Sequence, residues 1–327
     1  MKRLLVIAGG LGLVLAVAII AYEGFGAVSQ AFAAVGFGLL VVIILRGIQL
    51  AGAGLGWWIV FPPKAGRCPL HVCLWVRFIR EAINNLLPVA QVGGEIVGAR
   101  LITFFGISAG LAGATILVDM LMQVVTQFLF TIVGIGVLAM DPANDALLWS
   151  MVSGTAIMGA AFAGFFAVQR FGGAKFIDRA LMALAEKLGW SSLANLANLH
   201  DNLARIYADV PRFAVAILVH VIVWFVGVLE VLVALHFMGY PVSYADALVI
   251  ESLGQAVRAA AFLVPGALGV QEAAFISVCA VYGIPAVEAL ALSLVKRVPD
   301  LMLGPPFLFV WHAHEMRALI RRGRVQS

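Results

Sequence analysis

Long apolar stretches separated by short polar segments run along most of the chain. They cover residues 4–22, about 28–48, about 147–168 and about 213–237. Each is close to the roughly 20 residues that an α-helix needs to cross a hydrocarbon core about 30 Å thick. The pattern predicts a transmembrane helix in each stretch, and the second has room to continue to Trp57 and Trp58 at the membrane interface.

Basic residues indicate how these helices are oriented. The loop after the second span holds Lys64, Arg67, Arg77 and Arg80. Further basic residues lie in 170–212 and in the tail 312–327, whereas the loop at 141–145 is acidic. By the positive-inside rule, the basic segments and both termini are expected in the cytoplasm. Apolar residues recur at helical spacing within 170–212, which predicts two amphipathic helices along the inner interface.

Two regions, about 80–140 and about 244–311, hold more polar residues than a lipid-facing helix permits. In each, a polar helical stripe leads to a proline, then glycines, then a glutamate. The steps from Pro88 to Glu95 and from Pro265 to Glu272 are both seven residues long. The first region is entered from the cytoplasm and the second from outside, which is the arrangement of an inverted-topology repeat.

Charged residues recur at matching positions after these motifs. Asp119 follows Glu95 by 24 residues, and Lys296 follows Glu272 by the same step. A charged side chain at the centre of a membrane helix costs about 2.5–3.5 kcal/mol, so such residues are paired or hydrated. Proline and glycine near the midplane are tolerated around a cavity, which predicts a central polar cavity. The alternative is a set of interhelical ion pairs that holds the bundle together.

In this cavity, we expect the cationic side chains to meet an anionic or hydroxylated lipid headgroup, with Gln255 on the same helix face as Arg258. The expected cations are Arg258, Lys296 and Arg297. Acidic residues would balance these charges or carry protons. The expected acidic residues are Glu95, Asp119, Glu251, Glu272 and Asp300.

The composition supports a membrane protein and excludes several other classes. Hydrophobic residues make up 63% of the 327 positions and charged residues 12%, against about 45–50% and about 25% in soluble domains. We therefore expect an all-α polytopic membrane helix bundle, a single domain over 1–327 with at least six full spans. The sequence contains no long stripe of Lys and Arg of the kind that would indicate a nucleic-acid partner. The cluster of Cys68, His71 and Cys73 lacks a clear fourth metal ligand, and we expect neither a metal nor a cofactor.

The motifs at 84–95 and 258–274 resemble those of the flippase-like transmembrane family, whose namesake is the transmembrane region of lysylphosphatidylglycerol synthase. The second motif is most similar to the HpnL-type branch linked to hopanoid biosynthesis. The resemblance implies a bacterial inner-membrane protein that moves or handles a lipid. It also implies functional positions, which are Asn84, Asn85, Pro88, Gly94, Glu95, Arg258, Pro265, Gly269 and Glu272.

The resemblance therefore favours a flippase-like protein that translocates a polar-headed lipid, either a hopanoid or a phospholipid. The basic tail after residue 311 is short, so synthase activity is not expected, and no known catalytic motif is present. Two alternatives stay open. One is an integral-membrane enzyme that modifies a hopanoid or isoprenoid lipid, and the other is a non-catalytic partner of lipid-biosynthesis enzymes.

Overall fold

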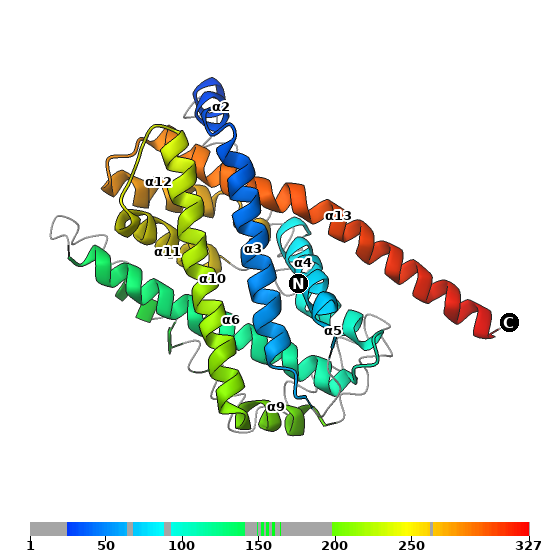
Figure 1. Ribbon diagram of the computed structural model, residues 1–327. Coiled ribbons are helices and arrows are strands. Elements are labelled where there is room, and N and C mark those ends of the chain that lie inside the picture. The colour runs from blue at the N-terminus through cyan, green and yellow to red at the C-terminus, as the bar shows by residue number, and fades with distance from the viewer. Residues whose placement is uncertain are drawn as a thin grey trace.

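The computed structural model shows a bundle of α-helices (Figure 1). It describes residues 25–63, 68–87, 93–140, 198–261 and 264–326, together with single positions between 149 and 164. The described residues form helices, turns and loops and contain no strand, which confirms the all-α fold class. The spans expected at 4–22 and 147–168, and the interfacial segment 170–197, lie wholly or largely outside the described residues.

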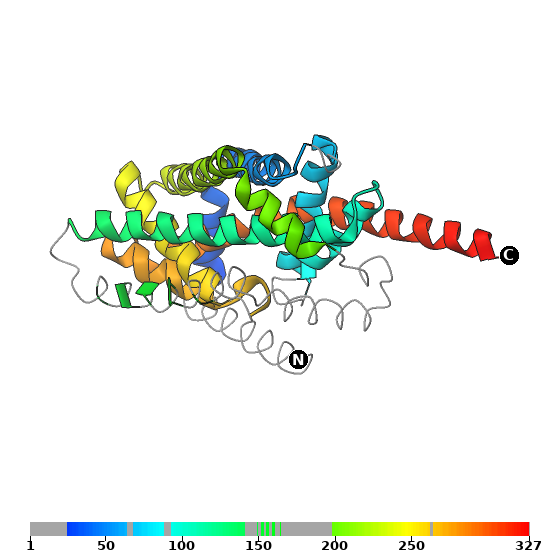
Figure 2. The ribbon, with the colours of Figure 1, turned by 90° about the horizontal axis from the view of Figure 1, so that it is seen from below.

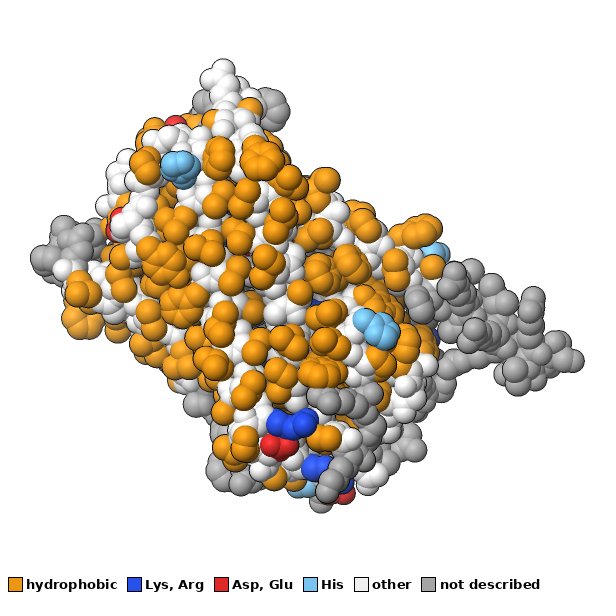
Figure 3. All heavy atoms as spheres, viewed as in Figure 1, with side chains coloured by type: hydrophobic (Ala, Val, Ile, Leu, Met, Phe, Trp, Pro, Cys, Tyr) orange, Lys and Arg blue, Asp and Glu red, His pale blue; other side chains and the backbone are white. Residues whose placement is uncertain are grey.

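Three described helices are long and apolar enough to cross a membrane. They are α3 (Gly38–Ile59), α6 (Ala109–Leu138) and α10 (Val210–Phe237). Their outward-facing side chains are apolar and exposed, as at Leu40 of α3 and Leu218 of α10. Figure 3 shows hydrophobic side chains over most of the visible face, with charged ones gathered near one end. Such a surface suits a lipid environment, where apolar side chains lose nothing by exposure.

The boundaries of the second predicted span are wrong. The chain instead forms a short helix, α2 (Phe25–Ala34), turns, and begins the spanning helix α3 at Gly38. At the turn, Gly36 adopts a positive φ of 48°, a conformation that glycine favours. A Cβ atom at Gly38 would lie 2.6 Å from the Phe237 ring, so α3 begins where it meets the end of α10. Uniform hydropathy across 28–59 concealed this break.

The described helices form two series, and the same order of long and short helices occurs in both. The first series is α3, α4 (Leu70–Leu86), α5 (Gly93–Thr103) and α6, and the second is α10, α11 (Tyr244–Ala260), α12 (Val270–Val281) and α13 (Ala286–Gln326). Each series has a long helix, a helix of 17 residues, a short helix and another long helix. Each series packs on the other. Helix α4 of the first series packs on α13 of the second, and α11 of the second packs on α6 of the first.

The two series run in opposite directions. Helix α3 runs towards the end where α9 (Leu199–Ala208) lies, and α10 runs back beside it (Figure 1). Figure 2 shows α3 and α10 side by side on one face of the bundle, with α6, α11 and α12 behind them. This is the arrangement that an inverted repeat predicts.

The two helices on either side of each break pack against each other. One hydrophobic cluster joins the start of α4 with the end of α5 near α9, through Val72, Ile102 and Leu203. Another cluster joins the start of α11 with the end of α12 at the opposite end, through Ala247 and Val278. The pairs α4–α5 (hairpin 1) and α11–α12 (hairpin 2) therefore each begin and end at the same end of the bundle, and the two pairs do so at opposite ends.

Helix α9 has the amphipathic pattern expected at 196–206. Its apolar residues Leu199, Leu203 and Ile206 are buried, and it packs on α6 and on the start of α10. Its polar face, which includes Asp201 and Arg205, is exposed. The apolar stripe therefore packs against the rest of the protein, and α9 covers one end of the bundle.

Candidate functional site

Charged side chains meet in the middle of the bundle, between the two hydrophobic clusters. Arg77 and Arg80 are among them. Both lie on α4 and are buried, and Arg80 is fully excluded from solvent. Their predicted placement in a cytoplasmic loop is therefore wrong, because α4 carries them inward from the α9 end.

The first group of charges, the hairpin-1 cluster, joins α4, α5, α6 and α10. It consists of Arg77, Arg80, Glu95, Asp119 and His220. Arg80 donates to Glu95 and, over 2.6 Å, to Asp119. Arg77 Nη1 lies 3.5 Å from the same Asp119 carboxylate, and His220 Nε2 lies 3.2 Å from its other oxygen. One buried carboxylate thus connects three helices.

Two glycines of α5 allow hairpin 1 to close tightly. A Cβ atom at Gly94 would lie 2.2 Å from the carbonyl oxygen of Arg80, and one at Gly98 would lie 2.7 Å from the Arg80 side chain. The Gly94 N–H donates to Asn84 Oδ1 over 2.8 Å, and Asn84 donates to Glu95 over 3.3 Å. Gly94 and Asn84, both predicted site residues, therefore hold α5 against α4.

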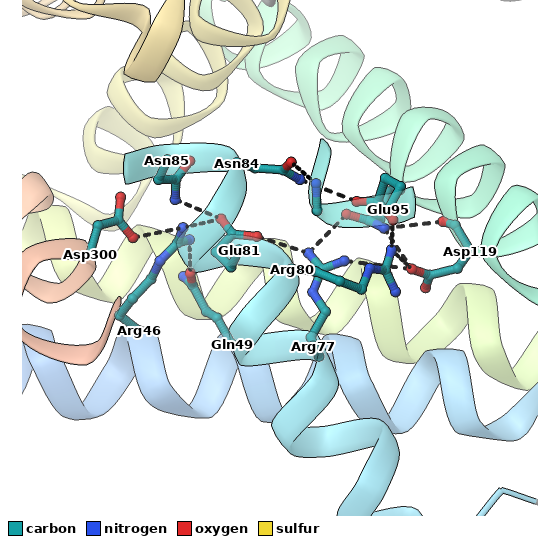
Figure 4. A network of polar contacts seen from close by, with 12 residues as sticks. Arg46, Gln49, Arg77, Arg80, Glu81, Asn84, Asn85, Glu95, Asp119 and Asp300 are labelled. Atoms are coloured by element: carbon teal, nitrogen blue, oxygen red, sulfur yellow. Dashed lines mark hydrogen bonds and ion pairs between the residues drawn. The ribbon is translucent and has the colours of Figure 1, made fainter. Parts of the chain in front are cut away.

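The second group, the inter-repeat cluster, connects the two helix series (Figure 4). It consists of Arg46, Glu81, Asn85, Arg258 and Asp300. Arg46 Nη2 lies 2.7 Å from Glu81 and 3.4 Å from Asp300. Arg258 of hairpin 2 donates to Asn85 of hairpin 1 over 2.9 Å, and lies 3.6 Å from Asp300. The tips of the two hairpins are therefore in direct contact.

Hairpin 2 has its own buried ion pair. Arg297 on α13 donates to Glu272 over 2.7 Å and to the Gly266 carbonyl over 2.7 Å. The other Glu272 oxygen accepts from the Gly269 N–H over 2.7 Å. Gly266 and Gly269 both have positive φ, which glycine accommodates. Glu272 is the third residue of α12, just as Glu95 is the third residue of α5.

A third group, the lysine triad, lies among α10, α11 and α13. Lys296 Nζ is 2.7 Å from Glu230 and 2.9 Å from Glu251, and all three side chains are about 2–3% exposed. Gln255 donates to Glu251 over 2.9 Å. Lys296 was expected to face a headgroup, but in this conformation two carboxylates surround its ammonium group.

Comparison with protein families decides the classification. Residues 5–303 match the family described as the lysylphosphatidylglycerol synthase TM region. The chain belongs to this family. The family suggests a membrane protein related to lipid synthesis or transport. Comparisons with curated proteins and with solved structures found no match.

In this member of the lysylphosphatidylglycerol synthase TM region family, the central polar side chains are bonded to one another. The sequence predicted a polar cavity at this level, and the described polar side chains there are joined by ion pairs. A hollow of about 420 Å³ lies instead beside α9 and the start of α6, where Asn198, Asp201 and Arg205 line it. The described residues hold no group of three His, Cys, Asp or Glu side chains placed to bind a metal.

Several residues of these charged groups were not predicted as site residues from the sequence. Arg46 was included in a predicted transmembrane helix and was not predicted as a site residue. A lone arginine in an apolar helix of 22 residues nevertheless indicates that a partner exists. His220 and Glu230 are not among the predicted site residues, because their partners Asp119 and Lys296 are distant in sequence. Among the other predicted site residues, Pro88 lies outside the described part, and Pro265 begins the short turn η3 (Pro265–Ala267).

Proposed function

We propose that this chain translocates a polar-headed lipid, either a hopanoid or an anionic phospholipid, between the leaflets of a bacterial inner membrane. In this proposal it is an HpnL-type member of its family and has no synthase activity. The α9 end lies in the cytoplasm together with both termini, as the positive-inside rule predicts. In this proposal, the ion-paired centre of the bundle is the occluded state of a transport cycle.

The contact between the hairpin tips is the observation that supports this proposal most strongly. Arg258 and Asn85 come from helix pairs that begin at opposite ends of the bundle, and they are joined by a hydrogen bond. Transporters with inverted repeats place their sites at such a junction and expose them by moving one repeat against the other. Buried charges at this depth are costly and typically mark a substrate or ion pathway.

The ion pairs suggest how a headgroup could pass. An anionic headgroup can replace Asp300 or Asn85 as the partner of Arg258, because a phosphate and a carboxylate accept the same guanidinium hydrogen bonds. Asp300 then keeps Arg46, which lies 3.4 Å away, so its carboxylate is not left unpaired during the exchange. Opening hairpin 1 admits the lipid from the α9 end, and opening hairpin 2 releases it at the other end. Lipid tails stay in the bilayer beside the apolar outer surface.

Leaflet exchange in sealed proteoliposomes tests the proposal. Fluorescent phospholipids and a labelled hopanoid are compared between wild type, Arg258→Ala and Glu272→Gln. Arg205→Ala on the exposed face of α9 serves as the matched control. We expect protein-dependent exchange that falls in the two site variants and persists in the control. Absence of exchange in folded wild-type protein contradicts the proposal, and turnover of a lipid in detergent supports an enzyme instead.

A further inference from the structure

The ring of His220 has an oxygen atom close to each of its nitrogens. Nδ1 lies 2.8 Å from the carbonyl oxygen of Ala216, and Nε2 lies 3.2 Å from Oδ1 of Asp119. A carbonyl and an ionised carboxylate only accept hydrogen bonds, so both contacts are hydrogen bonds only when both ring nitrogens carry hydrogen. A neutral imidazole carries one N–H. Making both hydrogen bonds therefore requires one proton more than a neutral histidine beside a carboxylate.

The surroundings of Asp119 favour its ionised form. The other carboxylate oxygen, Oδ2, accepts from Arg80 over 2.6 Å and from Gln123 over 2.9 Å, and Arg77 lies 3.5 Å away. Charge-assisted hydrogen bonds of this kind stabilise the ionised carboxylate. An ionised Asp119 then accepts a hydrogen bond from His220 Nε2 only when that nitrogen carries a hydrogen.

The site is enclosed and holds the ring in place. His220 is 2% exposed and Asp119 is fully buried. A Cβ atom on Gly56 of α3 would lie 2.4 Å from the imidazole carbon Cε1, so the absence of a side chain at this glycine leaves space for the ring. A buried charged pair of this kind persists because its members satisfy each other, since an unpaired one costs several kcal/mol.

The neighbouring elements supply a defined set of charges around the pair. Arg77 and Arg80 come from α4, and Glu95 of α5 contacts Arg80. Helix α3 contributes the uncharged Gly56, and α9 packs at the start of α10, near the surface ion pair of Asp209 with Arg212. Helices α11 and α13 provide Glu251 and Lys296, which meet α10 at Glu230, ten residues further along.

We propose that His220 and Asp119 form a proton-binding site that couples proton movement to lipid translocation. The coupling role rests on the function proposed above. With the proton bound, α10 is tied to α6 and, through Asp119 and Arg80, to α4 of hairpin 1. When the proton leaves, the lone pair of Nε2 faces Oδ1 and this connection is lost. Hairpin 1 is then free to move away from α10.

The protonation state can be measured without any transport assay. Protein with ¹⁵N-labelled histidine rings, in lipid at pH 7, is studied by solid-state NMR, and His220→Gln identifies the signals of this ring. We expect both ring nitrogens of His220 to be protonated, and only one in Asp119→Asn. His236→Gln, which removes an exposed histidine of the same helix, leaves these signals unchanged. A ring with one protonated nitrogen in wild type overturns the proposal.

The coupling is measured in proteoliposomes with a pH difference across the bilayer. One pH unit is worth about 1.4 kcal/mol per proton, so one-to-one coupling changes the leaflet distribution of the lipid by up to about tenfold. We expect this shift in wild type and in His236→Gln, and its loss in His220→Gln. A shift that persists in His220→Gln overturns the coupling role. If wild type moves no lipid, the proposed function and the coupling both fail, while the NMR result still decides whether the proton site exists.

Discussion

The geometry of the lysine triad predicts how much the free energy of unfolding falls when Lys296 is replaced. Lys296 Nζ is the shared partner of two carboxylates at 2.7 and 2.9 Å, and all three side chains are almost completely buried. Removing one partner of a buried ion pair typically costs about 3–5 kcal/mol, because the remaining charge stays uncompensated. Lys296→Met leaves two carboxylates without their cation, so we expect a loss in the upper half of this range.

The matched variant removes the charges together. In Lys296→Met/Glu230→Gln/Glu251→Gln, no uncompensated charge is left, and we expect the free energy of unfolding to recover to within about 2 kcal/mol of wild type. The free energy is measured by equilibrium unfolding in mixed micelles, with Arg205→Met on the exposed face of α9 as a control that changes it by less than about 1 kcal/mol. A loss below about 1 kcal/mol in Lys296→Met, or no recovery in the triple variant, would refute this reasoning.

Glycine substitutions test two close approaches in the bundle. Gly56→Ala places a methyl group against the histidine ring described above, 2.4 Å away, and should lower the free energy of unfolding by about 1–3 kcal/mol. Gly47→Ala on the same helix, where a Cβ atom meets nothing within 4 Å, should leave it unchanged or slightly raise it. Gly94→Ala directs its methyl group at the Arg80 carbonyl 2.2 Å away and should disrupt hairpin 1, measured as faster proteolysis around residue 88. Gly136→Ala, with open space around its Cβ position, should cleave like wild type, and equal rates for Gly94→Ala would contradict the tight contact.

The repeated motifs were predictable because they depend on positions close together in the chain. The equal steps from Pro88 to Glu95 and from Pro265 to Glu272 correspond to equal positions in the structure, since both glutamates are third residues of short helices. Helix breaks follow from proline and glycine, whose backbone properties act locally. The equal step to Asp119 and Lys296 likewise places both on the long helices that follow.

The partners of these charges could not be predicted in the same way. Arg46 contacts Asp300 across 254 positions, and the packing of α3 against α13 determines that distance. Asp119 and Lys296 occupy matching positions but carry opposite charges, so the spacing gave no information about their different partners. Hydropathy also did not predict where α3 begins, because the residues on both sides of the break at Gly36 are equally apolar.

The most direct test of the account is to lock the two helix series together and measure lipid translocation. An ideal Cβ atom at Gly304 of α13 lies 3.6 Å from the Cβ of Ala82 on α4, within the 3.5–4.5 Å typical of a disulfide. Neither residue belongs to the charged groups, so Ala82→Cys/Gly304→Cys should translocate lipid when reduced. We expect oxidation to stop exchange in sealed proteoliposomes and reduction to restore it. Equal exchange rates in the oxidised and reduced states, with the disulfide verified by mass spectrometry, would contradict the claim that lipid passes by movement of one repeat against the other.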